Sequence, residues 1–219
     1  MEKKKAKKIL RVILIIIIIL LVIFIIHTLR NFFIIKSIQD NIEPYLESKN
    51  FHIRSIATEE TGATITMNYY EKDGRKVTFL ERNDNGKIYK ISMYDNGGRQ
   101  DNFYDNEEGK TVQLNLEGQI WVNLYNYLET DNDWQTLIAS VVTKIKETEY
   151  NGKACYVIND FMSPMFMNGI EKNEVYIEKD TGLFLKSTMD STITEREYEF
   201  DNVDDSIFLE PDISQYTLK

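Results

Sequence analysis

The sequence has few of the residues on which most catalytic and metal sites depend. Its 219 residues include one cysteine, Cys155, and two histidines, His27 and His52. One cysteine excludes a disulfide within the chain, and no known motif places a Ser or Cys nucleophile around either histidine. The sequence also has no Gly-rich phosphate loop and no Cys/His spacing for a metal ion. We therefore expect a protein that is not an enzyme and that holds no cofactor or metal.

Proline and glycine are also scarce, with 3 and 10 residues, whereas the chain has 13 Tyr and 11 Phe. Aromatic residues favour half-buried strands, so the composition indicates a mainly β protein. No repeat of solenoid type is present. The segment KACYVIND around Cys155 alternates like a strand. It predicts that Cys155 is a small buried hydrophobe, with a reactive thiol as the less favoured alternative.

The N-terminus, MEKKKAKKILRVILIIIIILLVIFIIHTLR, joins a basic tail to a long apolar run. At about 1.5 Å per residue, residues 9–29 cover the roughly 30 Å hydrocarbon core of a membrane. A cleaved signal peptide is the alternative, but no small-x-small cleavage site follows the run. We predict a basic tail over residues 1–8, a transmembrane anchor over 9–29, and a juxtamembrane helix or linker over 30–50.

Charge predicts the orientation of this single span. Residues 1–11 contain six Lys/Arg and one Glu, so the positive-inside rule places the N-terminus in the cytoplasm and residues 30–219 outside the cell membrane. Subtracting this tail from the chain's 26 bases and 35 acids leaves 20 bases and 34 acids, a net charge of −14. Such an acidic domain argues against nucleic acid, and against an anionic bilayer surface as the main partner.

The juxtamembrane segment SIQDNIEPYLESKN has an apolar stripe at helical spacing, formed by Ile35, Ile38, Ile42 and Tyr45. Pro44 lacks an N–H group, so it is expected to kink or end this helix. We interpret the segment as a short amphipathic helix that packs on the following domain, with a signalling linker as the alternative.

From residue 51 the pattern changes to short alternating segments separated by hairpin signals. The turns are Asp73-Gly74, Asn85-Gly86, Asn96-Gly97-Gly98, Asn151-Gly152 and Asp180-Thr181-Gly182. They predict an antiparallel meander of about nine to eleven strands. The acidic turns NDNG and DNEEG lack the ligand spacing of a calcium loop and are interpreted as solvated hairpin tips.

One helical region interrupts the strands. Two apolar faces are predicted, the first formed by Trp121, Leu124, Tyr125 and Leu128 and the second by Trp134, Leu137, Ile138, Val141 and Val142. Asp133 is a candidate N-cap for the second helix, which is expected to stop where VVTKIKETEY enters a strand. Because a helix beside a sheet buries its apolar face, we interpret both faces as core rather than as a binding site.

The C-terminal third contains the segments ETEYNGKACYVIND, NEVYIEKDTGLFLKSTMD, ITEREYEFDNV and DDSIFLEPDISQY in this order. Over residues 143–216 this ordered set resembles the outer-membrane lipoprotein-carrier (LolA/LppX-like) superfamily. Over residues 51–116 the resemblance is limited to a run of hairpins. The order of the four segments is more specific than the DTGL turn alone, because Asp-x-Gly hairpins are common.

The resemblance implies an α+β, mainly β fold for residues 51–219. Its features would be a curved, half-open antiparallel sheet, helices on the concave face, and an apolar cavity that takes acyl chains or lipoproteins. Some relatives act as envelope-stress sensors. This chain differs from the carriers because it keeps a transmembrane anchor where they are released as soluble proteins. The resemblance therefore favours tethered binding or sensing over shuttling between membranes.

The loop FMSPMFMNG is the candidate ligand site, since Met side chains adapt to irregular apolar partners. Its apolar residues are Phe161, Met162, Met165, Phe166 and Met167. The alternative, which we favour, is that the loop covers the protein's own core. The sequence thus supports two functions: a membrane-tethered extracytoplasmic domain that binds a lipid or an acylated protein, or a protein-interaction or sensory module whose core is filled by its own side chains.

Overall fold

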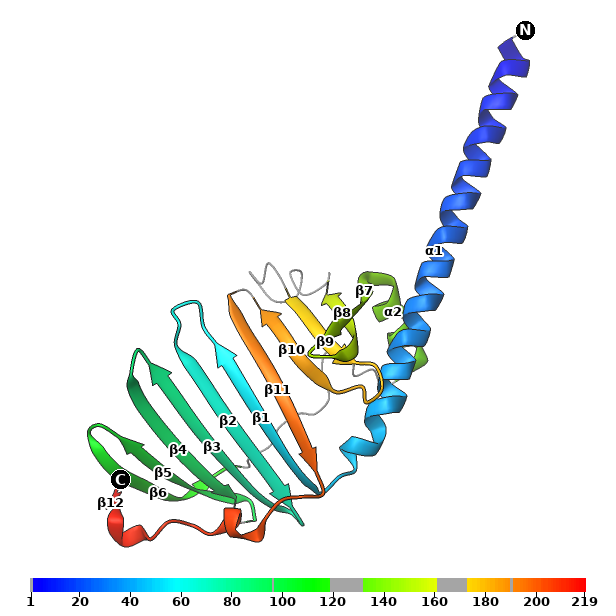
Figure 1. Cartoon of the computed structure of the whole chain (residues 1–219). Helices are drawn as coiled ribbons and strands as arrows, with labels where there is room; N and C mark the ends of the chain where they lie inside the picture. The colour runs from blue at the N-terminus through cyan, green and yellow to red at the C-terminus, as the bar shows by residue number, and fades with distance from the viewer. Residues whose placement is uncertain (1, 96, 119–131, 161–172, 190) are drawn as a thin grey trace.

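The computed structural model describes residues 2–95, 97–118, 132–160, 173–189 and 191–219. Figure 1 shows one long helix, α1 (Glu2–Leu46), which leads into a single large open sheet. The second helix, α2 (Asp133–Val142), lies beside α1 close to the sheet. The prediction of a mainly β protein with an N-terminal apolar helix and an open antiparallel sheet is confirmed.

The described strands form one sheet in the order β12-β6-β5-β4-β3-β2-β1-β11-β10-β9-β8-β7. Every neighbouring pair is antiparallel except β12 and β6, which run parallel. The bounds are β1 (Asn50–Thr58), β2 (Thr64–Lys72), β3 (Arg75–Asp84), β4 (Lys87–Asp95), β5 (Arg99–Asn106), β6 (Gly109–Glu117), β7 (Thr143–Tyr150), β8 (Lys153–Asp160), β9 (Asn173–Glu178), β10 (Phe184–Met189), β11 (Thr192–Phe200) and β12 (Thr217–Leu218).

The hairpins follow the turn signals of the sequence. The Asn85–Gly86 pair that joins β3 to β4 has φ of 53° and 93°, and the Asn151–Gly152 pair that joins β7 to β8 has φ of 51° and 77°. Two successive left-handed residues match the right-handed twist of a hairpin, and Asn and Gly adopt this conformation at least cost. The predicted meander is therefore confirmed at these turns.

The side chains of helix α1 are exposed in its N-terminal part and partly buried in its C-terminal part. In the part that the structure describes, it is the one helix long and apolar enough to cross a membrane, with a mean hydropathy of 3.7 over its most apolar window. Its side chains from residue 7 to residue 27 are all exposed. Beyond them, Ile35, Ile38 and Ile42 are buried, which confirms the predicted apolar stripe. Pro44 lies in the last turn, so the helix ends two residues later, at Leu46.

The C-terminal end of α1 provides the core of the adjacent half of the sheet. Its Ile34, Ile35 and Ile38 pack in one buried cluster with Ile145, Ile158, Val175, Ile177 and Phe184 from β7 to β10. A second cluster, around Phe51, Ile53 and Tyr69, includes Leu46 at the end of the helix. The Asn41 amide also donates to the Lys179 carbonyl at 2.6 Å. The same helix therefore contains the predicted anchor and part of the domain core.

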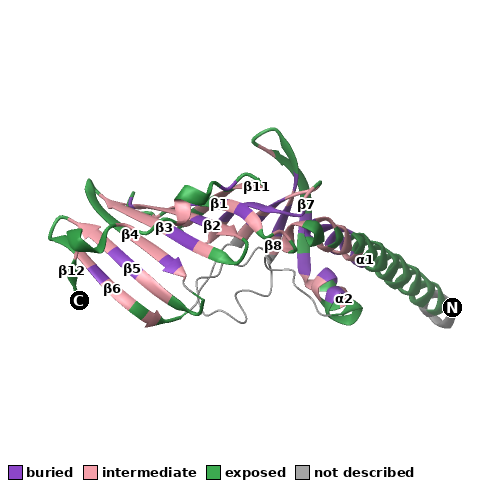
Figure 2. Cartoon of the chain, turned by 90° about the horizontal axis from the view of Figure 1, so that it is seen from below, coloured by how far each residue is buried: buried purple, intermediate pink, exposed green. Residues whose placement is uncertain are grey.

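A third buried cluster lies farther along the sheet, around Val77, Tyr94, Phe103 and Val112. The C-terminal segment covers it with Ile207, Phe208 and Tyr216. This segment contains two 3-10 turns, η1 (Asp205–Phe208) and η2 (Ile213–Gln215), before the short β12. Figure 2 shows the resulting buried rows on the strands, in contrast to the exposed surface of the apolar N-terminal half of α1.

The predicted core face of helix α2 is wrong, because a different face of the helix is buried. Its buried residues are Thr136 and Ser140, whereas Trp134, Ile138 and Val141 are exposed and Leu137 is half-buried. The reason is its partner: α2 packs on α1, where the Asn31 amide donates to the carbonyls of Ser140 and Thr143 at 3.0 and 2.8 Å. Small polar residues allow this close approach, so the apolar face points away from the contact.

The ends of α2 refine the sequence prediction. The N-cap is Asn132, not Asp133: the Asn132 side chain accepts from the Gln135 amide, and Asp133 is the first helical residue. The predicted early stop is confirmed, because α2 ends at Val142 and β7 begins at Thr143. The other predicted face, with Trp121, Leu124, Tyr125 and Leu128, lies outside the described residues.

Candidate functional site

The sheet opens between β10 and β11. These strands pair only from Lys186↔Glu195 to Met189↔Thr192, whereas β11 continues to Phe200 and is paired with β1 from Ile193 to Phe200. At the same place the β9–β10 register shifts between Phe184 and Lys186. A bulge bends its strand away from the ladder. The start of β10, before Lys186, therefore diverges from the end of β11, after Glu195. A cleft lies in this gap.

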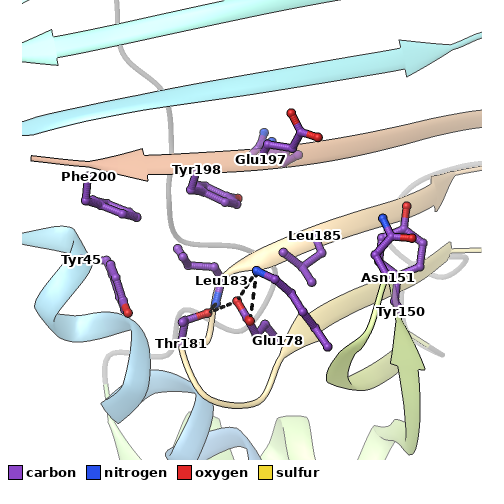
Figure 3. Close-up of a pocket in the computed structure, with 12 residues that line it drawn as sticks. Tyr45, Tyr150, Asn151, Glu178, Thr181, Leu183, Leu185, Glu197, Tyr198 and Phe200 are labelled. Atoms are coloured by element: carbon purple, nitrogen blue, oxygen red, sulfur yellow. Dashed lines mark hydrogen bonds and ion pairs between the residues drawn. The ribbon is translucent and has the colours of Figure 1, made fainter. Parts of the chain in front are cut away.

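The cleft has a volume of about 400 Å³. Figure 3 shows it between β11, the β9–β10 turn, the β7–β8 turn and the last turn of α1. One part of the lining is apolar or aromatic: Tyr45, Leu183, Leu185, Tyr198 and Phe200. The other part is polar: Tyr150, Asn151, Lys153, Glu178, Thr181, Arg196 and Glu197. The cleft thus combines an apolar, partly aromatic wall with charged side chains of both signs.

The apolar wall is built from three elements. The ring of Tyr45 at the end of α1 lies 4.8 Å from that of Phe200 on β11. On the same strand, Tyr198 stacks parallel to Phe200, and its hydroxyl donates to the Phe184 carbonyl of β10 at 2.7 Å. This hydrogen bond bridges the two strands where their ladder has ended.

The polar side of the cleft is also fixed by contacts. Glu178 accepts from the Thr181 hydroxyl at 2.8 Å and pairs with the Lys153 ammonium at 3.1 Å. The Arg196 guanidinium lies 4.9 Å from the centre of the Phe184 ring, a cation–π contact. Salt bridges and stacking hold these charged groups in place, so the cleft presents preformed polar contacts beside its aromatic wall.

Burial raises the pKa of Tyr198 to about 12, from an ordinary value of 10. Below pH 10 the phenol is neutral in the folded and unfolded chains, so its contribution to stability is intact. Between about pH 10 and 12 the unfolded chain loses this proton first, and the free energy of unfolding falls. We expect a phenolate absorbance titration of Tyr198→Phe to lack one late-titrating group and its stability to fall less steeply in this range. Titration curves identical to those of the unmodified chain would contradict this assignment.

Cys155 lies beside the cleft-lining residue Lys153 but is fully buried. Its thiol lies 3.4 Å from the Lys153 carbonyl, and burial is the main cause that raises the pKa of the thiol. A raised pKa and full burial both oppose thiolate chemistry. The prediction of a small buried residue is confirmed.

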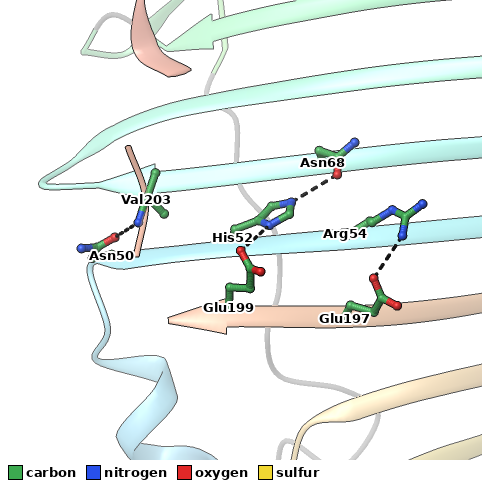
Figure 4. A network of polar contacts seen from close by, with 7 residues as sticks. All are labelled: Asn50, His52, Arg54, Asn68, Glu197, Glu199 and Val203. Carbon is green, nitrogen blue, oxygen red and sulfur yellow. Dashed lines mark hydrogen bonds and ion pairs between the residues drawn. The ribbon is translucent and has the colours of Figure 1, made fainter. Parts of the chain in front are cut away.

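His52 lies in a polar network on the other face of β1, since it alternates with the buried Phe51 and Ile53. Its ring stacks on Tyr70 at 4.2 Å between centroids, with Nε2 3.2 Å from Asn68 and Nδ1 3.4 Å from Glu199. Figure 4 shows the contacts of His52 with Asn68 and Glu199 beside the Arg54–Glu197 ion pair. These contacts account for both ring nitrogens. Within the described ranges, no group of three or more His, Cys, Asp or Glu residues is arranged to hold a metal ion.

The predicted ligand residues Phe161, Met162, Met165, Phe166 and Met167 lie outside the described residues, so their role stays a prediction. The cleft residues were not predicted as a site. The sequence contained part of the information needed to find the cleft. Tyr45 ends the apolar stripe of α1, and the DTGLFLK segment contains Leu183 and Leu185, which line the cleft. Nothing in the alternation of β10 and β11 indicates that the two strands separate.

Comparison with known proteins gives likenesses of fold only. No family model and no curated protein matches the chain. An uncharacterized conserved protein from Thermus thermophilus has a TM-score of 0.47 at 10% identity, with 84% of this chain and 98% of that chain covered. MucB in complex with MucA(peri) has a TM-score of 0.41 at 13% identity, with 78% and 58% covered.

A DUF1329 family protein from Desulfovibrio piger has a TM-score of 0.33 at 13% identity, with 84% of this chain and 97% of that chain covered. The resemblance to the LolA/LppX-like superfamily therefore stays a prediction. At these TM-scores the likenesses assign neither a family nor a function to the chain.

Proposed function

We propose that this chain is a membrane-tethered binding domain that takes an apolar or amphipathic ligand, such as a lipid or the acyl chain of a protein, in the cleft between β10 and β11. The observation that carries the proposal is the cleft itself, which has an aromatic and aliphatic wall beside fixed charges. A volume of about 400 Å³ lies within the usual range for small-molecule sites, which are mostly apolar with a few convergent polar groups. Binding rather than catalysis is the proposed role.

The position of the cleft along α1 bears on how a ligand reaches it. Tyr45 comes sixteen residues after Leu29, the end of the predicted span. At 1.5 Å per residue, this places the cleft roughly 24 Å along the helix from the hydrocarbon core. A lipid ligand therefore has to leave the bilayer, and the charged groups of the cleft suit a ligand with a polar head.

We also infer that the domain lies outside the cell membrane, with the N-terminus in the cytoplasm, because of the six basic residues among the first eleven. Protease added to intact cells or wall-less protoplasts is expected to degrade the domain. Full protection of the domain, or a mature N-terminus beyond residue 26, would overturn this orientation.

Ligand binding is tested with the full chain in nanodiscs and a fatty acid that carries a photoreactive diazirine. Crosslinks are expected in the peptides that contain Tyr45 and residues 196–200, and Tyr45→Ala should lower their yield several-fold. The matched control is Tyr89→Ala, which removes another partly exposed tyrosine, on β4, and should leave the yield unchanged. Native mass spectrometry of the chain purified from cells then identifies any lipid that co-purifies.

The outcome that contradicts binding is a crosslink pattern confined to the apolar half of α1 and unaffected by Tyr45→Ala. That outcome would favour the second function, a protein-interaction or sensory module. One observation supports this alternative. In the two clusters beneath the end of α1, Ile35 and Ile53 are fully buried and have no contact with solvent. The core under the helix is therefore filled by side chains of the chain itself.

A further inference from the structure

Helix α2 presents an apolar face that its packing on α1 leaves uncovered. Trp134, Ile138 and Val141 are 68%, 48% and 41% exposed and recur at helical spacing on one side. The buried residues of the helix are the small polar ones, Thr136 and Ser140. A stripe of large apolar side chains with polar residues opposite is typical of a helix that lies at an apolar boundary.

The contacts between α2 and α1 fix where this face lies. At the start of α2, Asp133 pairs with the Lys36 ammonium at 2.6 Å. At its end, the carbonyls of Ser140 and Thr143 accept from the Asn31 amide. Helix α2 therefore runs antiparallel to α1, and its C-terminal end points back toward the apolar half of α1.

This arrangement sets the depth of α2 relative to the predicted membrane span. Asn31 and Lys36 come two and seven residues after Leu29, or roughly 3 and 10 Å along the helix axis. The headgroup region of a bilayer extends about 5–8 Å beyond the hydrocarbon core. The end of α2 is thus level with the headgroups, and its first residues lie a few ångströms beyond them.

We propose that the face formed by Trp134, Ile138 and Val141 docks against the headgroup region of the bilayer that α1 spans, with Val141 deepest. The exposed apolar surface of the predicted span ends at Leu29, and Phe33 is exposed one turn later. Helix α2 lies beside this part of α1, between the levels of Asn31 and Lys36. Trp is also the residue enriched where proteins cross the membrane–water interface.

The charges around α2 suit this position better than the net charge of the whole domain suggests. Among the described residues, the basic ones next to the α1–α2 contact include Arg30 and Lys36 on α1 and Lys144 and Lys146 on β7, and the acidic ones include Asp133 on α2 and Glu147 and Glu149 on β7. Asp133 pairs with Lys36, and Glu147 pairs with Arg30 and Lys179. Exposed Lys144 and Lys146 follow the end of α2 directly and can reach lipid phosphates.

The inference is tested by nitroxide labels on the full chain in nanodiscs that hold one copy each. Cys155 is fully buried and remains unlabelled, so the label sites are Trp134→Cys, Ile138→Cys and Val141→Cys. The matched control is Ile193→Cys on β11, which is 39% exposed. Collision with oxygen, which partitions into lipid, is compared with collision with a water-soluble nickel chelate. We expect a several-fold higher oxygen-to-nickel ratio at 138 than at 193, with depth increasing from 134 to 138 to 141.

Two results would overturn the inference. Nickel accessibility at 138 equal to that at 193 would place the face in water, and low accessibility to both reagents would mean that protein covers it. If labelled variants fail to fold, the unmodified chain gives a second readout: phosphatidylcholine with a nitroxide on its headgroup should quench tryptophan emission, and Trp134→Phe should remove that component. The absence of such a component also contradicts docking. The inference requires α1 to span the membrane and does not depend on a ligand in the cleft, so the crosslinking experiment and this one fail separately.

Discussion

Replacing Gly182 by alanine is expected to destabilise the domain by about 2–5 kcal/mol, because it combines left-handed strain with a backbone clash. Gly182 has φ of +68° in the turn between β9 and β10. A Cβ atom there would lie 2.4 Å from the Ile38 carbonyl oxygen and 2.9 Å from the Ile42 nitrogen. Neither atom can move without displacing α1, so the variant tests the contact of the turn with the helix. The measurement is denaturant-induced loss of β structure in the full chain.

The matched control is Gly152→Ala in the β7–β8 turn. Gly152 has a similar φ of +77°, but no atom lies within 4 Å of a Cβ built there. The control therefore has only the left-handed cost of about 1–2 kcal/mol. If the two variants lost equal stability, the turn of β9 and β10 would not press against α1, and the described packing would be wrong.

Ile35→Ala is expected to produce the second large effect. Ile35 is fully buried in the cluster between α1 and β7 to β10. Truncation of a buried isoleucine leaves a cavity and costs about 2–5 kcal/mol. The free energy of unfolding, measured in the same denaturation experiment, should fall by this amount while the predicted transmembrane part of α1 stays inserted.

Ile193→Ala serves as the comparison, since Ile193 is 39% exposed on β11. A substitution at such a surface position usually changes stability by less than about 0.5 kcal/mol. An Ile35→Ala variant as stable as Ile193→Ala would mean that the juxtamembrane half of α1 is a tether, not a part of the core.

The strands were predictable because their signals are local. Asn-Gly and Asp-Gly pairs specify tight hairpins, and the residues between them alternate on a pleated ribbon. Such short-range patterns place the turns at Asn85–Gly86 and Asn151–Gly152 without knowledge of the rest of the fold. The apolar stripe through Ile35, Ile38 and Ile42 was equally visible, because burial against a sheet requires helical periodicity.

The helix and its end at Val142 were predicted correctly, but the predicted core face of α2 was wrong because the partner of the helix could not be inferred from its own sequence. The periodicity identifies an apolar face with Trp134, Ile138 and Val141, and a soluble domain would normally bury it. In the structure Asn31 of α1 binds the backbone carbonyls of Ser140 and Thr143, which turns the polar side of α2 inward. The choice between these faces depends on a contact more than 100 residues away in the chain.

The cleft was not predictable for a related reason. It forms where the β10–β11 ladder ends at Lys186↔Glu195 although β11 continues to Phe200. β11 alternates regularly, and the adjacent buried Phe184 and Leu185 at the start of β10 do not by themselves indicate that the strands separate. The bulge near Phe184 and the docking of the turn on α1 create the gap together, and both are tertiary features.

Hydrogen–deuterium exchange of the full chain in nanodiscs tests most directly whether α1 is one continuous element from membrane to core. The structure has no break between residue 29 and Ile42, and Ile35, Ile38 and Ile42 are buried. Amides from residue 30 to residue 42 are therefore expected to exchange as slowly as those of the central strand β1. Complete exchange of residues 30–37 within seconds, as in a flexible linker, would contradict this account.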